Sequence, residues 1–108
     1  MNNKNWNNKK SEELFKAVIK LENIGETKKF FRDLLTAEEI IEFSKRWQTA
    51  QMLDQDISYE KIVKKTGLSS RTVARISKWL NGKNGGYKLM LKKINHHHNL
   101  SPARKRLR

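Results

Sequence analysis

The sequence has no cysteine and only one proline. Without cysteine the chain cannot form disulfides or use a thiolate in catalysis, which fits a reducing compartment. No apolar run approaches the roughly 20 residues that span a bilayer, and residues 1–10 are polar, with no stretch typical of a signal peptide behind them. We therefore expect a cytoplasmic protein without a membrane partner.

Histidine is also scarce, because the chain has three, at positions 96–98. Catalysis generally needs a base beside a nucleophile or a metal, and no such pairing is evident, so we predict that the protein is not an enzyme. Adjacent histidines can bind zinc, copper or nickel. No further ligand stands in a rigid framework, so we expect a polar tail segment and no metal site.

Acidic residues are missing from the second half of the chain. Residues 61–108 contain 14 Lys and Arg and no Asp or Glu, whereas residues 1–60 contain 10 basic and 11 acidic residues. The formal net charge of +13 therefore comes from the second half. A field of one sign destabilises a small protein through self-repulsion. A polyanionic partner relieves it, so the distribution favours nucleic-acid binding over a merely solubilising surface.

Strand patterns are absent as well, since no stretch alternates polar and apolar residues over the length of a strand. Apolar residues recur instead at helical spacing, which predicts an all-α fold of about six helices. These span residues 11–22, 26–35, 37–54, 59–65, 70–80 and 87–94. The helices form one domain over 11–94, between a polar N-terminal arm, 1–10, and a basic tail, 95–108, that we expect to be disordered.

Polar residues mark several helix ends. Thr36 and Glu39 fit a capping box, in which each side chain accepts a hydrogen bond from the backbone of the other. Gly82 is suited to the left-handed position that closes helix 70–80. Three serines are placed to cap the helices that follow them: Ser11, Ser58 and Ser69.

The segment 58–81 has the pattern of a helix-turn-helix. A short turn joins its two helices and contains Gly67, where we expect a positive φ. Leu68 is placed to fill the gap between the helices, and Val73 and Ile76 to pack the second helix onto the first. Because this pattern lies in the acid-free half of the chain, it predicts a unit whose second helix enters the major groove of DNA.

The outward residues of this unit follow once Val73, Ile76 and Leu80 face the core. Arginine can bind guanine through two hydrogen bonds, and lysine suits phosphate. The N–H groups at the start of the second helix can also bind phosphate. For any one residue, a solvated surface charge is the alternative. The predicted DNA contacts are Ser69, Ser70, Arg71, Thr72, Arg75 and Lys78, with Lys61, Lys64 and Lys65 on the first helix.

From Leu14 to Leu91 the chain resembles the Trp repressor family, most closely its YerC/YecD branch. The resemblance rests on four stretches in the family order and spacing: LLTAEE, RWQTAQML, SYEKIVKKTG and SSRTVARI. It implies an all-helical fold in which two chains interlock through their N-terminal helices, and hence a homodimer. The N-terminal segments are very apolar for so small a monomer, which agrees with that expectation.

The resemblance also implies an effector pocket between the long helix and the recognition helix. In tryptophan-sensing members two arginines flank it, and their positions match Arg46 and Arg75. Where those members carry a glycine and a serine, this chain has Ile76 and Trp79, which would take the space that an indole needs. We therefore expect no tryptophan cofactor, and we expect the side chain of Trp79 to fill the pocket itself. Alternatively, Arg46 pairs with Glu42, one turn earlier.

These patterns predict a transcription regulator that binds double-stranded DNA sequence-specifically. The resemblance implies that it represses transcription. Two alternatives belong to other classes. A non-sequence-specific nucleic-acid-binding protein is supported equally by the acid-free half, and a helical protein-interaction module could use the helix-turn-helix to contact protein. The basic stretch SPARKRLR, residues 101–108, is expected to lie along DNA phosphates.

Overall fold

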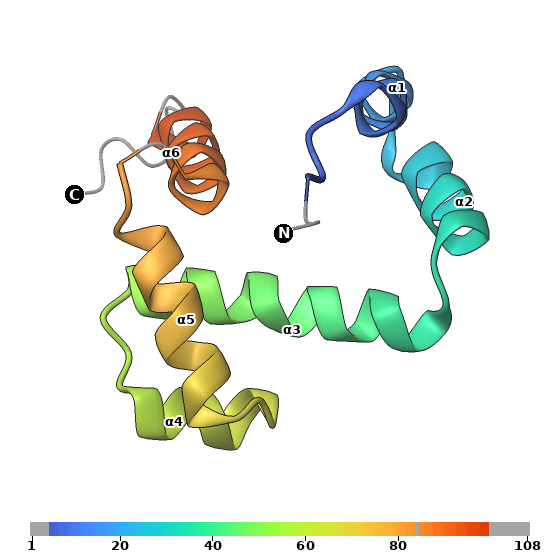
Figure 1. The fold of residues 1–108 in the computed structure, drawn as a ribbon. Coiled ribbons are helices and arrows are strands. Elements are labelled where there is room, and N and C mark those ends of the chain that lie inside the picture. Colours follow the sequence, from blue (N-terminus) through green and yellow to red (C-terminus); the bar gives the residue numbers. More distant parts are fainter. Residues whose placement is uncertain (1–4, 84, 100–108) are drawn as a thin grey trace. The chain divides into compact units, whose positions relative to one another are not determined.

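A computed structural model of the chain describes residues 5–83 and 85–99. Within these ranges it has six α-helices and no strands, which confirms the predicted all-α class (Figure 1). The helices are α1 Lys9–Val18, α2 Ile24–Leu34, α3 Ala37–Asp54, α4 Tyr59–Thr66, α5 Ser70–Leu80 and α6 Gly86–Asn99. They form two compact units, the first ending at Ile40 and the second beginning at Ile41.

The start of α1 corrects one predicted cap. The cap is Asn8, whose side-chain oxygen accepts a hydrogen bond from the Ser11 N–H at 3.0 Å. The Ser11 hydroxyl in turn accepts from the Asn8 N–H at 2.9 Å. Ser11 is thus the inner member of a reciprocal box and not the cap itself, and α1 begins earlier in the chain than its apolar spacing predicted.

Side-chain caps also set the limits of α2 and α3. Asn23 accepts from the Glu26 N–H at 2.9 Å, so α2 begins at Ile24 rather than at Glu26. The predicted capping box before α3 is confirmed. The Thr36 N–H donates to Glu39 Oε1 at 2.9 Å, and the Glu39 N–H donates to Thr36 Oγ1 at 3.0 Å.

The first unit leaves much of its apolar surface uncovered. No residue of α1 or α2 is buried. Ile19, just after α1, is 79% exposed, and Ile24 at the start of α2 is 71% exposed. Trp6 packs edge-on against Phe15 at 6.2 Å between ring centroids, and both rings stay exposed. Within the first unit, the apolar residues of the N-terminal helices therefore stay uncovered.

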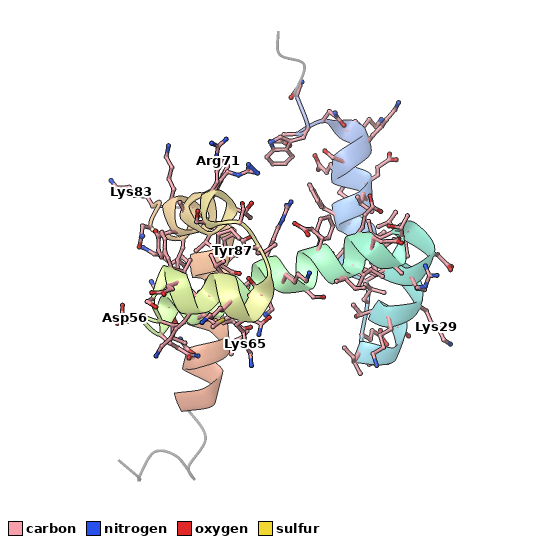
Figure 2. The ribbon with its side chains drawn as sticks, turned by 90° about the horizontal axis from the view of Figure 1, so that it is seen from below. Lys29, Asp56, Lys65, Arg71, Lys83 and Tyr87 are labelled. Atoms are coloured by element: carbon pink, nitrogen blue, oxygen red, sulfur yellow. The ribbon has the colours of Figure 1, made fainter. Side chains whose placement is uncertain are left out.

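The second unit has a hydrophobic core of its own. Its buried cluster comes from α3, α4, the α4–α5 turn and α5, with Tyr87 of α6 packed against it (Figure 2). Tyr87 stacks on Trp47 at 6.3 Å between centroids and 20° between ring planes, which ties α6 to α3. The members of the buried cluster are Ala50, Ile62, Leu68, Val73 and Ile76.

Two further predictions about helix ends need correction. The closing residue of α5 is Asn81, at φ −85° and ψ 2°, and Gly82 does not have a positive φ. The Asn81 side-chain amide donates to the Ser77 carbonyl at 2.9 Å, so a side chain satisfies the helix end in place of a left-handed residue. In addition, α6 continues to Asn99, because residues 95–99 contain no helix-breaking Gly or Pro. Those five residues are thus helical, and 100–108 lie outside the described residues.

Candidate nucleic-acid interface

The turn between α4 and α5 has the conformation that its glycine predicts. Gly67 closes α4 at φ 81° and ψ 1°, and its N–H donates to the Val63 carbonyl at 2.8 Å. A residue with a Cβ is disfavoured in this left-handed region, which explains why glycine stands there. The turn reverses the chain within three residues, 67–69, before α5 begins at Ser70.

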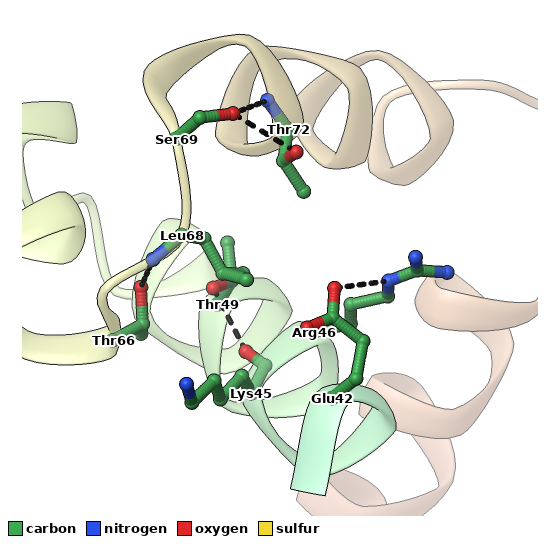
Figure 3. A network of polar contacts seen from close by, with 8 residues as sticks. All are labelled: Glu42, Lys45, Arg46, Thr49, Thr66, Leu68, Ser69 and Thr72. Atoms are coloured by element: carbon green, nitrogen blue, oxygen red, sulfur yellow. Dashed lines mark hydrogen bonds and ion pairs between the residues drawn. The ribbon is translucent and has the colours of Figure 1, made fainter. Parts of the chain in front are cut away.

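A buried threonine holds the turn from inside (Figure 3). The Thr66 hydroxyl donates to the Ile62 carbonyl at 2.8 Å and accepts from the Leu68 N–H at 3.1 Å. Both bonds satisfy polar groups that would otherwise be buried without partners. With its N–H fixed, Leu68 inserts its side chain into the core between the helices, as predicted.

The packing of α5 on α4 follows the predicted pattern. Ile62 of α4 and Val73 of α5 have no exposed surface, and Ile76 is 4% exposed. These three residues belong to one buried cluster with Leu68. Since this face of α5 is buried, the helical period fixes which side chains point outward.

The first turn of α5 combines a formed cap with exposed side chains. Ser69 accepts from the Thr72 N–H at 3.1 Å, and the Ser69 hydroxyl donates to the Thr72 hydroxyl at 3.1 Å. Ser69, Ser70 and Arg71 are exposed, whereas Thr72 is half-buried. Figure 2 shows Arg71 directed away from the body of the helices. Its guanidinium is therefore free to meet an external group.

The predicted cations of the helix-turn-helix are all exposed and have no acidic partner. Within the described residues the ion pairs join Lys16 to Glu12 and Arg46 to Glu42. No carboxylate therefore neutralises the six basic residues of this surface, which we call the basic surface: Lys61, Lys64, Lys65, Arg71, Arg75 and Lys78.

The basic surface does not point in one direction. Figure 2 shows Arg71 and Lys65 projecting from different sides of the α4–α5 pair. Lys61 and Lys65 are four residues apart and so share one face of α4. Arg71 and Arg75 have the same spacing on α5. The α5 arginines and this pair of α4 lysines are thus two separate groups of charge.

A cavity of about 400 Å³ lies beside the basic surface, between α3, α5 and the start of α6. Arg46 and Arg75, the two arginines expected to flank an effector, both line it. Ile76 forms part of its wall, and Trp79 lines it while remaining 63% exposed. Trp79 thus borders an open cavity in this conformation, and the expectation that no tryptophan binds remains a prediction.

Arg46 combines the two roles that the sequence left open. Its Nε lies 3.4 Å from Glu42 Oε2, which is the predicted ion pair within α3 (Figure 3). The Nε is buried without hydrogen-bond geometry to any partner, so the contact with Glu42 is one of charge attraction. The guanidinium carbon also lies 5.7 Å from the centre of the Phe43 ring. The pair and the ring hold Arg46 at the cavity wall.

Two residues near the site were not identified from the sequence as part of it. The Nζ of Lys45 is 4.0 Å from the position that a Cβ on Gly67 would take, so a cation from α3 lies beside the turn. Tyr87 lines the cavity from α6. Both approach the site through tertiary packing, and no periodic signal in the sequence marks such an approach.

Other kinds of site find no support in the described part of the chain. It contains no group of three or more His, Cys, Asp or Glu side chains that could hold a metal ion. The side chains of His96, His97 and His98 lie outside the described residues. Among the described helices, none combines the length and apolar character needed to cross a bilayer.

Comparisons with known proteins agree with this geometry. The family described as Trp repressor protein matches residues 9–95. The uncharacterized protein YerC of Bacillus subtilis (strain 168) is 34% identical over 86 residues, which cover 80% of this chain and 83% of YerC. A TrpR-like protein from Eubacterium eligens matches in structure with a TM-score of 0.78 at 35% identity, covering 87% of this chain and 96% of its own. A Trp repressor-like structure from Staphylococcus aureus matches with a TM-score of 0.77 at 35% sequence identity. The match covers 88% of this chain and 95% of that chain.

Proposed function

Because the chain belongs to the Trp repressor family, whose members regulate transcription by binding DNA, we propose that it is a sequence-specific repressor that reads the major groove with α5. The observation that carries this proposal is the exposed first turn of α5. There Ser70 and Arg71 project from a capped helix that is packed on Ile62 and Val63 of α4. The N-terminal residues of a recognition helix are the ones that contact base edges.

Arg71 and the lysines have different tasks in this proposal. Arg71 contacts base edges, and a bidentate bond to guanine contributes roughly 1–3 kcal/mol of discrimination. The lysines Lys61, Lys64 and Lys65 neutralise phosphates, which positions the protein without reading sequence. The Ser70 and Arg71 N–H groups in the first turn of α5 add a phosphate site, because no preceding turn of the helix supplies a carbonyl for them, whereas the Thr72 N–H is bonded to Ser69.

The active form is proposed to be a homodimer acting in the cytoplasm. The uncovered apolar residues around α1 and α2, among them Ile19 and Ile24, support this form because a second chain can bury them. A symmetric dimer presents two copies of α5 to one face of DNA. The half-sites then lie about 34 Å apart, or a multiple of that distance, on a near-palindromic operator. Bound at a promoter, the dimer would block transcription by occlusion.

DNA binding is proposed to need no tryptophan. Ile76 and Trp79 take up volume on the wall of the cavity between Arg46 and Arg75, in the place where the sensing members have smaller residues. Calorimetry with L-tryptophan tests this point. We expect no heat of binding at concentrations up to about 1 mM, which corresponds to less than about 4 kcal/mol of binding free energy. Micromolar binding of L-tryptophan contradicts it.

Selection of bound duplexes from a random library tests the proposed function. The expected outcome is enrichment of one near-palindromic sequence with two half-sites about ten base pairs apart. Recovery of unrelated duplexes in proportion to their input favours the non-sequence-specific nucleic-acid binder. Failure to retain any duplex at low salt favours a protein-interaction module.

A further inference from the structure

A second hollow of the second unit is larger than the cavity beside α5 and lies apart from the basic surface. Its volume is about 590 Å³, and its lining comes from the end of α3, the residues after it, the end of α5 and one side of α6. Small-molecule sites typically have volumes of about 300–1,000 Å³. No residue of the basic surface lines this hollow, so an occupant would not compete directly with DNA.

The charges around this hollow are opposite in sign and separated. Asp54 and Asp56 line it from the end of α3 and the following turn, and Lys88 and Lys92 line it from α6. Among the described residues none of these four side chains takes part in an ion pair within 4.0 Å or in a hydrogen bond. The hollow therefore offers two carboxylates and two ammonium groups that do not satisfy one another.

The like charges lie close together in the chain. Lys88 and Lys92 are four residues apart on α6, a spacing at which two cations repel each other. Asp56 is held at φ 61°, a left-handed conformation that aspartate tolerates better than most residues. The two carboxylates thus come from the end of α3 and the turn after it, and the two ammonium groups come from α6.

This arrangement limits the charge of a ligand. A dication is attracted by Asp54 and Asp56 but repelled by Lys88 and Lys92, and the reverse holds for a dianion. A molecule that carries one ammonium and one carboxylate complements both sides. The apolar residues Leu53, Leu80 and Leu91 also line the hollow, and they favour an aliphatic group on the ligand beside its charged groups.

We propose that this hollow binds a zwitterion with an aliphatic side chain, such as a free amino acid or a short peptide. Its ammonium lies against Asp54 and Asp56, and its carboxylate lies against Lys88 and Lys92. Because the lining joins α3, α5 and α6, an occupant ties the ends of these helices together and stabilises the folded state by mass action. This inference does not depend on the proposed DNA binding.

Titration of the full chain with matched probes tests the proposal. L-Leucine and the dipeptide L-leucyl-L-leucine carry both charges, and whichever fits the spacing of the two sides is expected to bind. L-Leucinamide lacks the carboxylate and N-acetyl-L-leucine lacks the ammonium, so each should bind at least about tenfold more weakly. Amide chemical shifts should move at Lys92 and Asn95, which line the hollow.

Two double variants and one control assign the charged ends. Asp54→Asn with Asp56→Asn, and separately Lys88→Gln with Lys92→Gln, should each weaken zwitterion binding at least about tenfold. Lys93→Gln changes a neighbouring lysine of α6 that does not line the hollow, and it should leave binding unchanged. DNA affinity of the aspartate variant should not fall, which separates this test from that of the proposed function.

Three results would overturn the proposal. The first is that no amide chemical shift changes with either zwitterion at tens of millimolar, while circular dichroism shows that the chain is folded. The second is equal binding of N-acetyl-L-leucine and L-leucine, which would make the hollow a simple anion site. The third is unchanged zwitterion binding in the Asp54→Asn, Asp56→Asn variant.

Discussion

Replacement of Arg71 should change which DNA sequence the protein recognises. Arg71 is exposed, lies in the first turn of α5 and has no acidic partner among the described residues. Arg71→Ala should cost roughly 1–3 kcal/mol of binding free energy on the selected operator and much less on random DNA, because a base contact is lost. Fluorescence anisotropy with both duplexes measures the difference.

Lys64→Ala is the matched control for that experiment. Lys64 is exposed on α4, where a phosphate contact is proposed. Its loss should weaken binding to both duplexes alike, and the negative slope of log affinity against log salt should become shallower by about 0.9. Equal losses on operator and random DNA for both variants would contradict the assignment of base reading to Arg71.

Gly67 tests the local geometry of the turn. At φ 81° a Cβ is disfavoured, although space is available, since the nearest atom to a built Cβ is Lys45 Nζ at 4.0 Å. Gly67→Ala should therefore lower the free energy of unfolding by about 1–2 kcal/mol through backbone strain alone. Urea unfolding at fixed protein concentration measures it.

Gly86 provides the contrast to Gly67. It is the first residue of α6, and a Cβ there meets no atom within 4 Å. Gly86→Ala should leave stability unchanged or raise it by about 0.4–1 kcal/mol, because alanine reduces the entropy of the unfolded chain. A loss as large as that of Gly67→Ala would show that the left-handed conformation is not what destabilises the turn variant.

At the scale of the helices, the capping box before α3 makes a specific prediction. Thr36 and Glu39 exchange hydrogen bonds at 2.9 and 3.0 Å. Thr36→Ala should lower the free energy of unfolding by about 1 kcal/mol, within the usual range for an N-cap. Thr36→Ser keeps the hydroxyl and should retain most of that stability. Similar unfolding midpoints for all three proteins would mean that the box does not stabilise α3.

The helical cores were predictable because apolar residues repeat at the helical period and only one face of each helix can be buried. Val73 and Ile76 are buried for this reason. Helix ends were less predictable. Near α1, Asn8 and Ser11 are both good capping residues, and their reciprocal bonds decide which one caps. The extension of α6 to Asn99 rests on a polar sequence without apolar periodicity.

The surroundings of the site depend on tertiary contacts between helices, which the sequence pattern does not predict. The exposure of Arg71 and the burial of Ile76 follow from the period of one helix. In contrast, the approach of Lys45 to Gly67 and of Tyr87 to Trp47 requires three helices to be packed. The opposed charges of the second hollow likewise come from the end of α3 with the turn after it and from α6, which are distant in the sequence.

At the scale of the whole molecule, the uncovered apolar residues predict dimerisation. Ile19→Glu changes a side chain that is 79% exposed in the single chain, so the fold of one chain should tolerate it. In a dimer that buries this face, a buried unpaired charge is strongly unfavourable, and the variant should be largely monomeric. Sedimentation equilibrium measures the mass. Lys20→Glu, an exposed neighbour, should leave the dimer intact.

The dimer prediction has a clear contradictory outcome. If the native chain sediments as a monomer at micromolar concentration, or if Ile19→Glu and the native chain have the same mass, this face is not the interface. Two copies of α5 would then have to be brought to DNA in another way, or the protein would bind a single half-site.

The charge distribution favours binding to any polyanion, so affinity alone cannot identify a regulator. The net charge of +13 arises in the acid-free half that contains α4, α5 and α6. The ratio of specific to non-specific affinity is therefore the most direct test. Anisotropy titrations at physiological salt should give a dissociation constant for the selected operator at least about 10³-fold below that for a scrambled duplex of equal length. Equal dissociation constants for the two duplexes would contradict the account.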